Sequence, residues 1–152
     1  MPKIREQDLA LLSSARNGLT FLTANDWALI ADRAVSVQFL EGDFLVHKGK
    51  DSNGIYFIVG GKARVRLAAW ATLPPISPGE ICGEMSYLEQ GPASADVVAT
   101  EPVNAYHLDR KTLQDLFELF PHLASRFYRS VAINLSRRIR SLVSQASSPA
   151  PG

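Results

Sequence analysis

The chain has 152 residues, of which 46% are hydrophobic and 20% are charged, and its formal net charge is +1. This length suits one domain that buries roughly two-thirds of its unfolded surface. The composition excludes a disordered or fibrous protein. Because the net charge is close to zero, the chain as a whole has no field that attracts nucleic acid or an anionic membrane, and any such role has to be local.

The sequence lacks the signals of secretion and of membrane insertion. Cys82 is the single cysteine, so no intramolecular disulfide can form, and we interpret it as a small buried hydrophobe. The first residues lack the apolar stretch of a secretory signal, and no later run approaches the roughly 18 apolar residues that a bilayer span needs. We therefore expect a cytoplasmic protein without a membrane span.

Two short helices are predicted in the N-terminal segment 1–34. The first covers residues 5–15, where leucines alternate with charged residues. The second begins after Thr23, because Thr23 and Asp26 have the spacing of a capping box, in which the Thr23 hydroxyl accepts from a first-turn N–H and Asp26 lies at the positive end of the helix.

Short β-rich runs replace the helical pattern in segment 35–108. The runs are separated by glycine-containing turns and cover residues 35–40, 44–47, 55–59, 63–67, 95–100 and 103–108. The proline-rich stretch 74–79 cannot form a central strand, so it lies at a sheet edge or interrupts the sheet. Several short strands at this spacing favour a β-sandwich or barrel.

Two helices are predicted in segment 109–143, followed by a flexible tail at 144–152. Asp109 can cap the first helix, and Pro121 separates it from the second. The second helix carries one apolar stripe, formed by Leu123, Phe127, Val131, Leu135, Ile139 and Leu142. The stripe either packs against the chain's own barrel or forms a dimer seam, with Phe127, Val131, Leu135 and Ile139 as candidate contacts.

Three stretches carry a resemblance to a known family. Residues 39–50 (FLEGDFLVHKGK), 55–65 (IYFIVGGKARV) and 77–86 (SPGEICGEMS) resemble the cyclic nucleotide-binding domain family. The resemblance implies an α+β fold, in which an eight-stranded antiparallel β-barrel of the jelly-roll type is flanked by N-terminal and C-terminal helices. It also implies a phosphate-binding cassette at residues 80–96 and a regulatory module that is not an enzyme.

In that family a cyclic phosphate is held without a metal. A short helix offers free N–H groups, a glutamate accepts from the ribose 2′-hydroxyl, and an arginine pairs with the phosphate. Gly83 and Glu84 match the family's glycine and glutamate, and Met85 and Ser86 fit the short helix. Pro92 matches the family's proline.

The phosphate side departs from the family pattern. Ala93 stands where the resemblance places the arginine, and Asp96 stands at the expected threonine or serine, although Ser94 could supply a hydroxyl. Without the arginine, the binding free energy for the phosphate is weaker by about 1.5–3 kcal/mol, which corresponds to a loss of roughly 10- to 150-fold in affinity. We expect Asp96 to add repulsion.

A replacement cation would have to come from elsewhere in the chain. The candidates are arginines of one strand and of the last helix: Arg64, Arg66, Arg126, Arg129, Arg137, Arg138 and Arg140. From Pro121 onward there are five arginines and no acidic residue. This set is either a solvated face or a surface that docks a partner or caps a ligand.

Two functional hypotheses follow. The first is a sensor that weakly binds cyclic AMP, cyclic GMP, a cyclic dinucleotide or a related anionic nucleotide and signals through its last helix. The second is a ligand-free module for homodimerisation or for docking another protein, and the chain could also be one piece of a larger protein. A metal site is not expected, because His47, His107 and His122 are scattered, and about ten residues after Leu142 leave no room for a DNA-binding motif.

Overall fold

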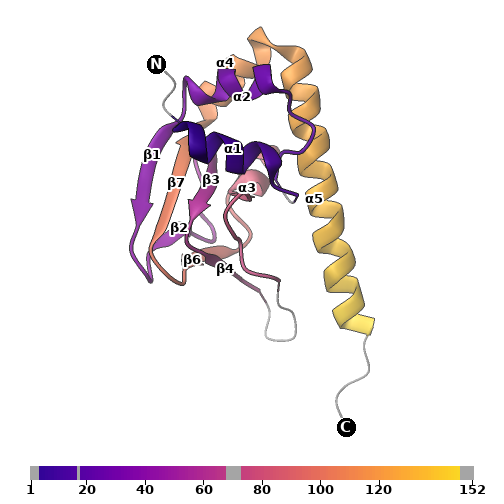
Figure 1. Ribbon diagram of the computed structural model, residues 1–152. Coiled ribbons are helices and arrows are strands. Elements are labelled where there is room, and N and C mark those ends of the chain that lie inside the picture. Colours follow the sequence, from indigo (N-terminus) through magenta and orange to yellow (C-terminus); the bar gives the residue numbers. More distant parts are fainter. Residues whose placement is uncertain (1–3, 17, 68–72, 148–152) are drawn as a thin grey trace.

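The computed structural model describes residues 4–16, 18–67 and 73–147 (Figure 1). Helices α1 (Glu6–Ser14) and α2 (Ala24–Ala31) come first, and helices α4 (Arg110–Leu119) and α5 (Pro121–Ser147) come last. Between them lie seven strands and the short helix α3 (Glu84–Glu89). None of the helices in this described part combines the length and hydrophobicity that crossing a lipid bilayer requires.

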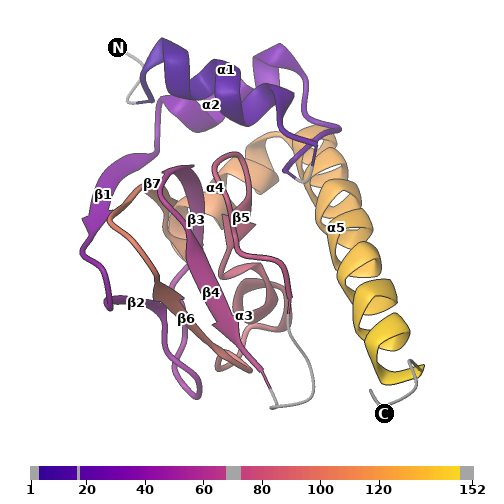
Figure 2. The same ribbon diagram turned by 60° about the horizontal axis from the view of Figure 1, so that its bottom comes forward.

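The strands form two antiparallel sheets. The four-stranded sheet has the order β1 (Val35–Phe39), β7 (Val103–Leu108), β3 (Ile55–Gly60), β5 (Ile81–Cys82). The three-stranded sheet has the order β2 (Phe44–Val46), β6 (Asp96–Ala99), β4 (Ala63–Arg66). Figure 2 shows α3 beside these strands and α5 along one side of them.

The α+β jelly-roll class is confirmed, but the expected number of eight strands is wrong. The described residues form seven strands, and their pairings give two separate sheets, not a closed barrel. The proline-rich stretch explains part of the difference, because its described part contributes an isolated bridge between Ile76 and Ala63 in place of a strand. Prolines lack the N–H that a longer ladder would need.

Helix α2 begins as its capping box predicts. Thr23 Oγ1 accepts from the Asp26 N–H at 3.1 Å, and the Asp26 carboxylate accepts from the Thr23 N–H at 2.9 Å. The same carboxylate is buried and receives two hydrogen bonds from Arg126, at 2.6 and 2.8 Å. The cap therefore also joins α2 to α5.

Two apolar cores lie on the two faces of the four-stranded sheet. Side chains alternate along β7, so Tyr106 packs with residues of the helices, such as Trp27, whereas Ala105 packs with residues of the second sheet, such as Val97. Ile58 belongs to this second core, which lies between the sheets.

Helix α5 divides into two parts with different surroundings. Phe127 and Val131 are buried in the chain's own helical core, which is the first of the two alternatives for the apolar stripe. Leu135 is partly buried against the same core, whereas Ile139 is 60% exposed. The helix continues to Ser147, past its expected end at residue 143, because no proline or glycine interrupts it before residue 149. Residues 148–152 of the expected tail lie outside the described residues.

Candidate ligand-binding site

A glycine turn leads from β5 into the short helix α3. Gly83 is the N-cap of α3 and has a φ of +87°, and a Cβ added there would lie 2.9 Å from the Gly54 carbonyl oxygen. Glycine adopts this backbone conformation without steric cost, whereas other residues are strained. The short helix therefore begins at the glycine that the resemblance identified, and the two-residue strand β5 before it was missed.

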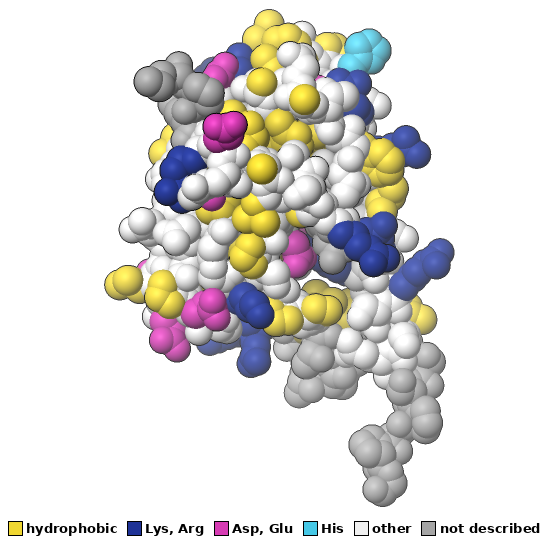
Figure 3. All heavy atoms as spheres, viewed as in Figure 1, with side chains coloured by type: hydrophobic (Ala, Val, Ile, Leu, Met, Phe, Trp, Pro, Cys, Tyr) yellow, Lys and Arg dark blue, Asp and Glu magenta, His cyan; other side chains and the backbone are white. Residues whose placement is uncertain are grey.

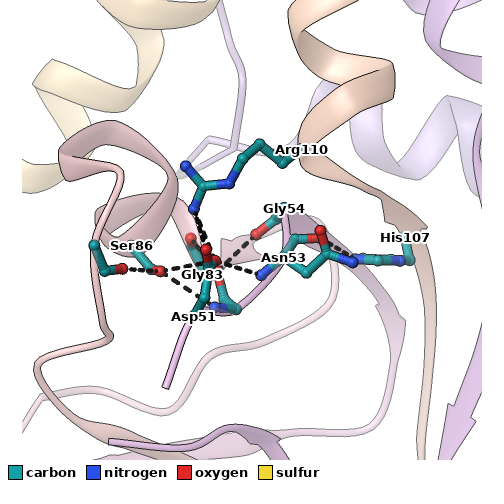
Figure 4. Close-up of polar contacts among 9 residues, drawn as sticks. Asp51, Asn53, Gly54, Gly83, Ser86, His107 and Arg110 are labelled. Atoms are coloured by element: carbon teal, nitrogen blue, oxygen red, sulfur yellow. Dashed lines mark hydrogen bonds and ion pairs between the residues drawn. The ribbon is translucent and has the colours of Figure 1, made fainter. Parts of the chain in front are cut away.

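The hydroxyl of Ser86 holds the cassette in place (Figure 4). Ser86 Oγ donates to the Gly91 carbonyl at 2.5 Å and accepts from the Ser52 N–H at 3.2 Å. Ser52 Oγ in turn donates to the Gly83 carbonyl, at 3.0 Å. The Ser86 hydroxyl thus fastens α3 to the loop that precedes β3.

An ion pair connects this network to the start of α4. Arg110 Nη2 lies 2.7 and 2.8 Å from the two carboxylate oxygens of Asp51, and Asp51 Oδ1 lies 3.4 Å from Ser86 Oγ (Figure 4). The Asn53 backbone N–H, followed by the Arg110 guanidinium, lowers the pKa of Asp51. These contacts fix the cassette helix against both the β2–β3 loop and α4.

A cavity of about 410 Å³ lies between α3, the strands and α5. Its walls are largely apolar and include Val46, Val65, Ile76, Val97, Leu135 and Ile139. Polar side chains reach it from Glu84, Ser86, Ser94 and Arg138. The volume lies in the range of small-molecule sites, and a few polar groups in an apolar cavity are typical of them.

An ion pair between Glu84 and Arg138 lies at the cavity and joins the cassette to α5. Arg138 Nη1 lies 2.6 Å from Glu84 Oε1, and the side chains of Arg138 and Glu84 are 24% and 5% exposed. Burial is the largest cause that raises the pKa of nearby Glu80, and the negative charge of Glu84 raises it further. The Ser77 N–H and, to a smaller extent, Arg138 lower the pKa of Glu80. Arg138 is therefore the cation that balances the buried Glu84 and the half-buried Glu80.

The phosphate side of the expected site is apolar. Ala93 is 7% exposed and lines the cavity, and its backbone bonds to the β2–β3 loop, with N–H to the Lys50 carbonyl at 2.8 Å. Asp96 starts β6 and accepts from the Lys48 N–H at 2.7 Å, and it is not among the described residues that line the cavity. The expected repulsion from Asp96 at the site is therefore not supported.

Six of the eight predicted site residues come together at the cavity: Gly83, Glu84, Met85, Ser86, Ala93 and Ser94. Pro92 and Asp96 are outside the described lining. Residues of α5 complete the site, and sequence reasoning placed Leu135, Ile139 and Leu142 on one stripe without assigning them to a cavity.

Three of the six other candidate arginines have different partners. Arg126 pairs with Asp26, and the guanidinium of Arg129 lies 4.1 Å from the centre of the Phe21 ring. Arg66 lies 5.3 Å from the ring of Phe44. Figure 3 shows dark blue side chains gathered on the side of the molecule that α5 forms.

The histidines do not form a metal site in the described part of the chain. His47 stacks on Phe44, and His107 Nε2 lies 2.9 Å from the Asn53 carbonyl oxygen. No group of three or more histidine, cysteine or acidic side chains that could hold a metal ion occurs among the described residues.

Comparison with known proteins agrees with this geometry. Residues 36–119 match the family described as "Cyclic nucleotide-binding domain". The chain is 31% identical over 104 residues to the cyclic AMP receptor protein of Thermus thermophilus, covering 66% of this chain and 46% of that protein. It is 30% identical over 121 residues to glutaminase 2 of Bradyrhizobium diazoefficiens, covering 80% of this chain and 19% of that protein.

A solved structure supports the fold over almost the whole chain. The cyclic nucleotide-binding domain from Methylobacillus flagellatus superposes with a TM-score of 0.77 at 19% identity, covering 96% of this chain and 85% of that one. The chain spans less than half the length of the two curated relatives named above. Since the family match covers more than half of the residues, the chain belongs to the cyclic nucleotide-binding domain family.

Proposed function

We propose that this chain is a non-enzymatic regulatory module that binds a cyclic nucleotide, or a related anionic nucleotide, weakly and signals through α5. The observation that carries the proposal is the Glu84–Arg138 ion pair, because it joins the family's ribose-binding glutamate to the last helix. A ribose hydroxyl that donates to Glu84 competes with Arg138 for the same carboxylate. Ligand binding therefore changes a contact that holds α5 against the cassette.

Weak binding follows from position 93. Ala93 is buried and lines the cavity without a charge. A guanidinium at this place would form a charge-assisted bond worth about 1.5–3 kcal/mol with a phosphate, so its absence weakens binding by roughly 10- to 150-fold.

Calorimetric titration with cyclic AMP, cyclic GMP and a cyclic dinucleotide tests the binding step. We expect weak saturable binding to the natural chain and a 10- to 150-fold gain in the Ala93→Arg variant. Ser13→Arg is the control, because it adds the same charge at an exposed residue of α1 outside the described lining of the cavity. If neither the natural chain nor Ala93→Arg responds to any nucleotide at millimolar concentration, the proposal is refuted.

Hydrogen exchange tests the signalling step. Amides of α5 from Leu135 onward should change their exchange rates when cyclic AMP saturates the chain, because their helix loses or gains a contact at Arg138. Amides near Phe127 should keep their rates, since that part of α5 is buried in the helical core. Uniform rates along α5 in both states would contradict signalling through this helix.

A second candidate function is a ligand-free dimerisation or protein-interaction module. The observation in its favour is the large exposure of Ile139, an apolar side chain on the α5 stripe. Under this alternative the chain self-associates without nucleotide, and Leu135→Arg or Ile139→Arg abolishes the association. Sedimentation of the natural chain as a monomer at high micromolar concentration would count against dimerisation.

A further inference from the structure

The cavity contains one acidic side chain and one basic side chain. Among the described residues that line it, Glu84 is the acid and Arg138 alone carries a positive charge. The remaining lining is apolar or uncharged, including Ala93 at the position where the family's arginine was expected. An anion that enters this cavity therefore meets a single lining cation, and that cation comes from α5.

The geometry of the ion pair leaves the guanidinium able to make further contacts. Its bond to Glu84 runs from Nη1 alone, at 2.6 Å, and a guanidinium carries five N–H donors in a planar fork. Such a fork matches the oxygens of a phosphate as well as those of a carboxylate. Arg138 can therefore donate to a ligand phosphate without first leaving the cavity.

A cyclic nucleotide brings a replacement partner for each member of the pair. Its ribose hydroxyl donates to the buried Glu84 carboxylate, and its phosphate accepts from the Arg138 guanidinium. Neither charge is then left without a partner in the apolar cavity, which would be costly. The pair seen in the ligand-free chain thus separates into two contacts with the ligand.

We propose that Arg138 is the phosphate-binding arginine of this chain, supplied by α5 in place of the arginine that position 93 lacks. This inference rests on the proposed function, since it names the residue that contacts the ligand's anion. It assigns α5 a direct part in binding, because Leu135 and Ile139 on either side of Arg138 line the same cavity. A phosphate contact at Arg138 therefore transfers the presence of ligand to α5 itself.

Titration of Arg138→Gln with cyclic AMP and with adenosine tests the assignment. The substitution removes the guanidinium, so the glutamine side chain offers no positive charge to the phosphate. We expect roughly a 10-fold or greater loss of cyclic AMP affinity and little change for adenosine, which has no phosphate. Arg140→Gln is the matched control, because Arg140 is an exposed arginine on the same helix, and it should bind like the natural chain.

A second comparison covers the case in which Arg138→Gln does not fold. The single variant Glu84→Gln is compared with the double variant Glu84→Gln/Arg138→Gln. Both carry the same change on the ribose side of the cavity, and the double variant leaves neither charge of the ion pair without its partner. The difference between them isolates Arg138, and we expect the same loss of roughly 10-fold or more for cyclic AMP. Adding Ala93→Arg to Arg138→Gln should restore binding.

The outcomes separate this inference from the proposed function. If the natural chain binds cyclic AMP and Arg138→Gln binds it equally well or more tightly, the inference is overturned. The chain would then be a nucleotide-binding module in which Arg138 only blocks Glu84. Loss of adenosine affinity equal to that of cyclic AMP also overturns it, because the effect would then not involve phosphate. Absence of binding by both the natural chain and Ala93→Arg refutes the proposed function.

Discussion

Replacing Phe127 by alanine should remove a large part of the stability of this chain. Phe127 is 0% exposed, and its ring centre lies 4.9 Å from that of Phe117 and 6.3 Å from that of Tyr87. Deleting a buried phenylalanine costs about 3–5 kcal/mol, because the transfer free energy is lost and a cavity remains. At about 2–4 °C per kcal/mol for a chain of this size, the melting temperature should fall by about 6–20 °C.

Ile139→Ala is the matched comparison on the same helix. This side chain is 60% exposed, so its truncation should change the free energy of unfolding by about 0.5 kcal/mol or less. Urea denaturation followed by circular dichroism, at two protein concentrations tenfold apart, measures both variants. A Phe127→Ala variant as stable as the natural chain, or a loss that depends on protein concentration, would refute intramolecular packing of Phe127 and indicate an interface between chains.

Three further measurements test the site and its surroundings. Gly83→Ala should destabilise the chain by about 1–3 kcal/mol in urea melts, because the φ of +87° and the nearby Gly54 carbonyl disfavour a Cβ at this position. Gly91→Ala should be neutral, because the nearest atom to an added Cβ is the Glu89 carbonyl oxygen at 3.8 Å. Equal effects of the two variants would contradict the strained turn. The Cys82 thiol should react with a disulfide reagent only when the chain unfolds, because burial raises its pKa and blocks access, and labelling at the same rate in native buffer and in urea would show this wrong. The hydrogen bond from Arg126 is the main cause that lowers the pKa of Asp26. This pair therefore stabilises the fold above the unfolded pKa of about 4, and the stabilisation is lost as the pH falls through the lower pKa of the folded state. The urea midpoint should drop in that acid range, and it should drop less in Asp26→Asn.

Elements with strong local signals were predictable from the sequence. The Thr23–Asp26 capping box and the Asp109 cap lie in neighbouring residues, so the sequence alone contains both partners of each hydrogen bond. The break at Phe120 likewise follows from the proline after it. By contrast, β5 has two residues, Ile81 and Cys82, which is too short for an alternating pattern, and its existence depends on pairing with β3.

The cassette residues of the site could be predicted from the sequence, whereas the residues that α5 contributes could not. Gly83 and Glu84 were identified by a resemblance in consecutive residues, and the structure brings both to the cavity. The choice of Arg138 among the arginines of the last helix depends on how that helix is rotated against the cassette. Contacts 54 residues apart in sequence set this rotation, so no local pattern contains it.

Two hydrogen bonds anchor α5 near its middle. The Asn134 side chain donates to the Gly18 carbonyl at 2.9 Å, and Ser130 accepts from the Phe21 N–H at 3.1 Å. At 1.5 Å per residue, Arg138 lies about 6 Å and Ser147 about 20 Å beyond Asn134 along the helix. For a straight helix that pivots at Asn134, a displacement of about 1 Å at Arg138 becomes a displacement of about 3 Å at Ser147. Under the proposed function, a rearrangement of the Arg138 guanidinium would thus produce a displacement about three times larger at the C-terminal end of α5.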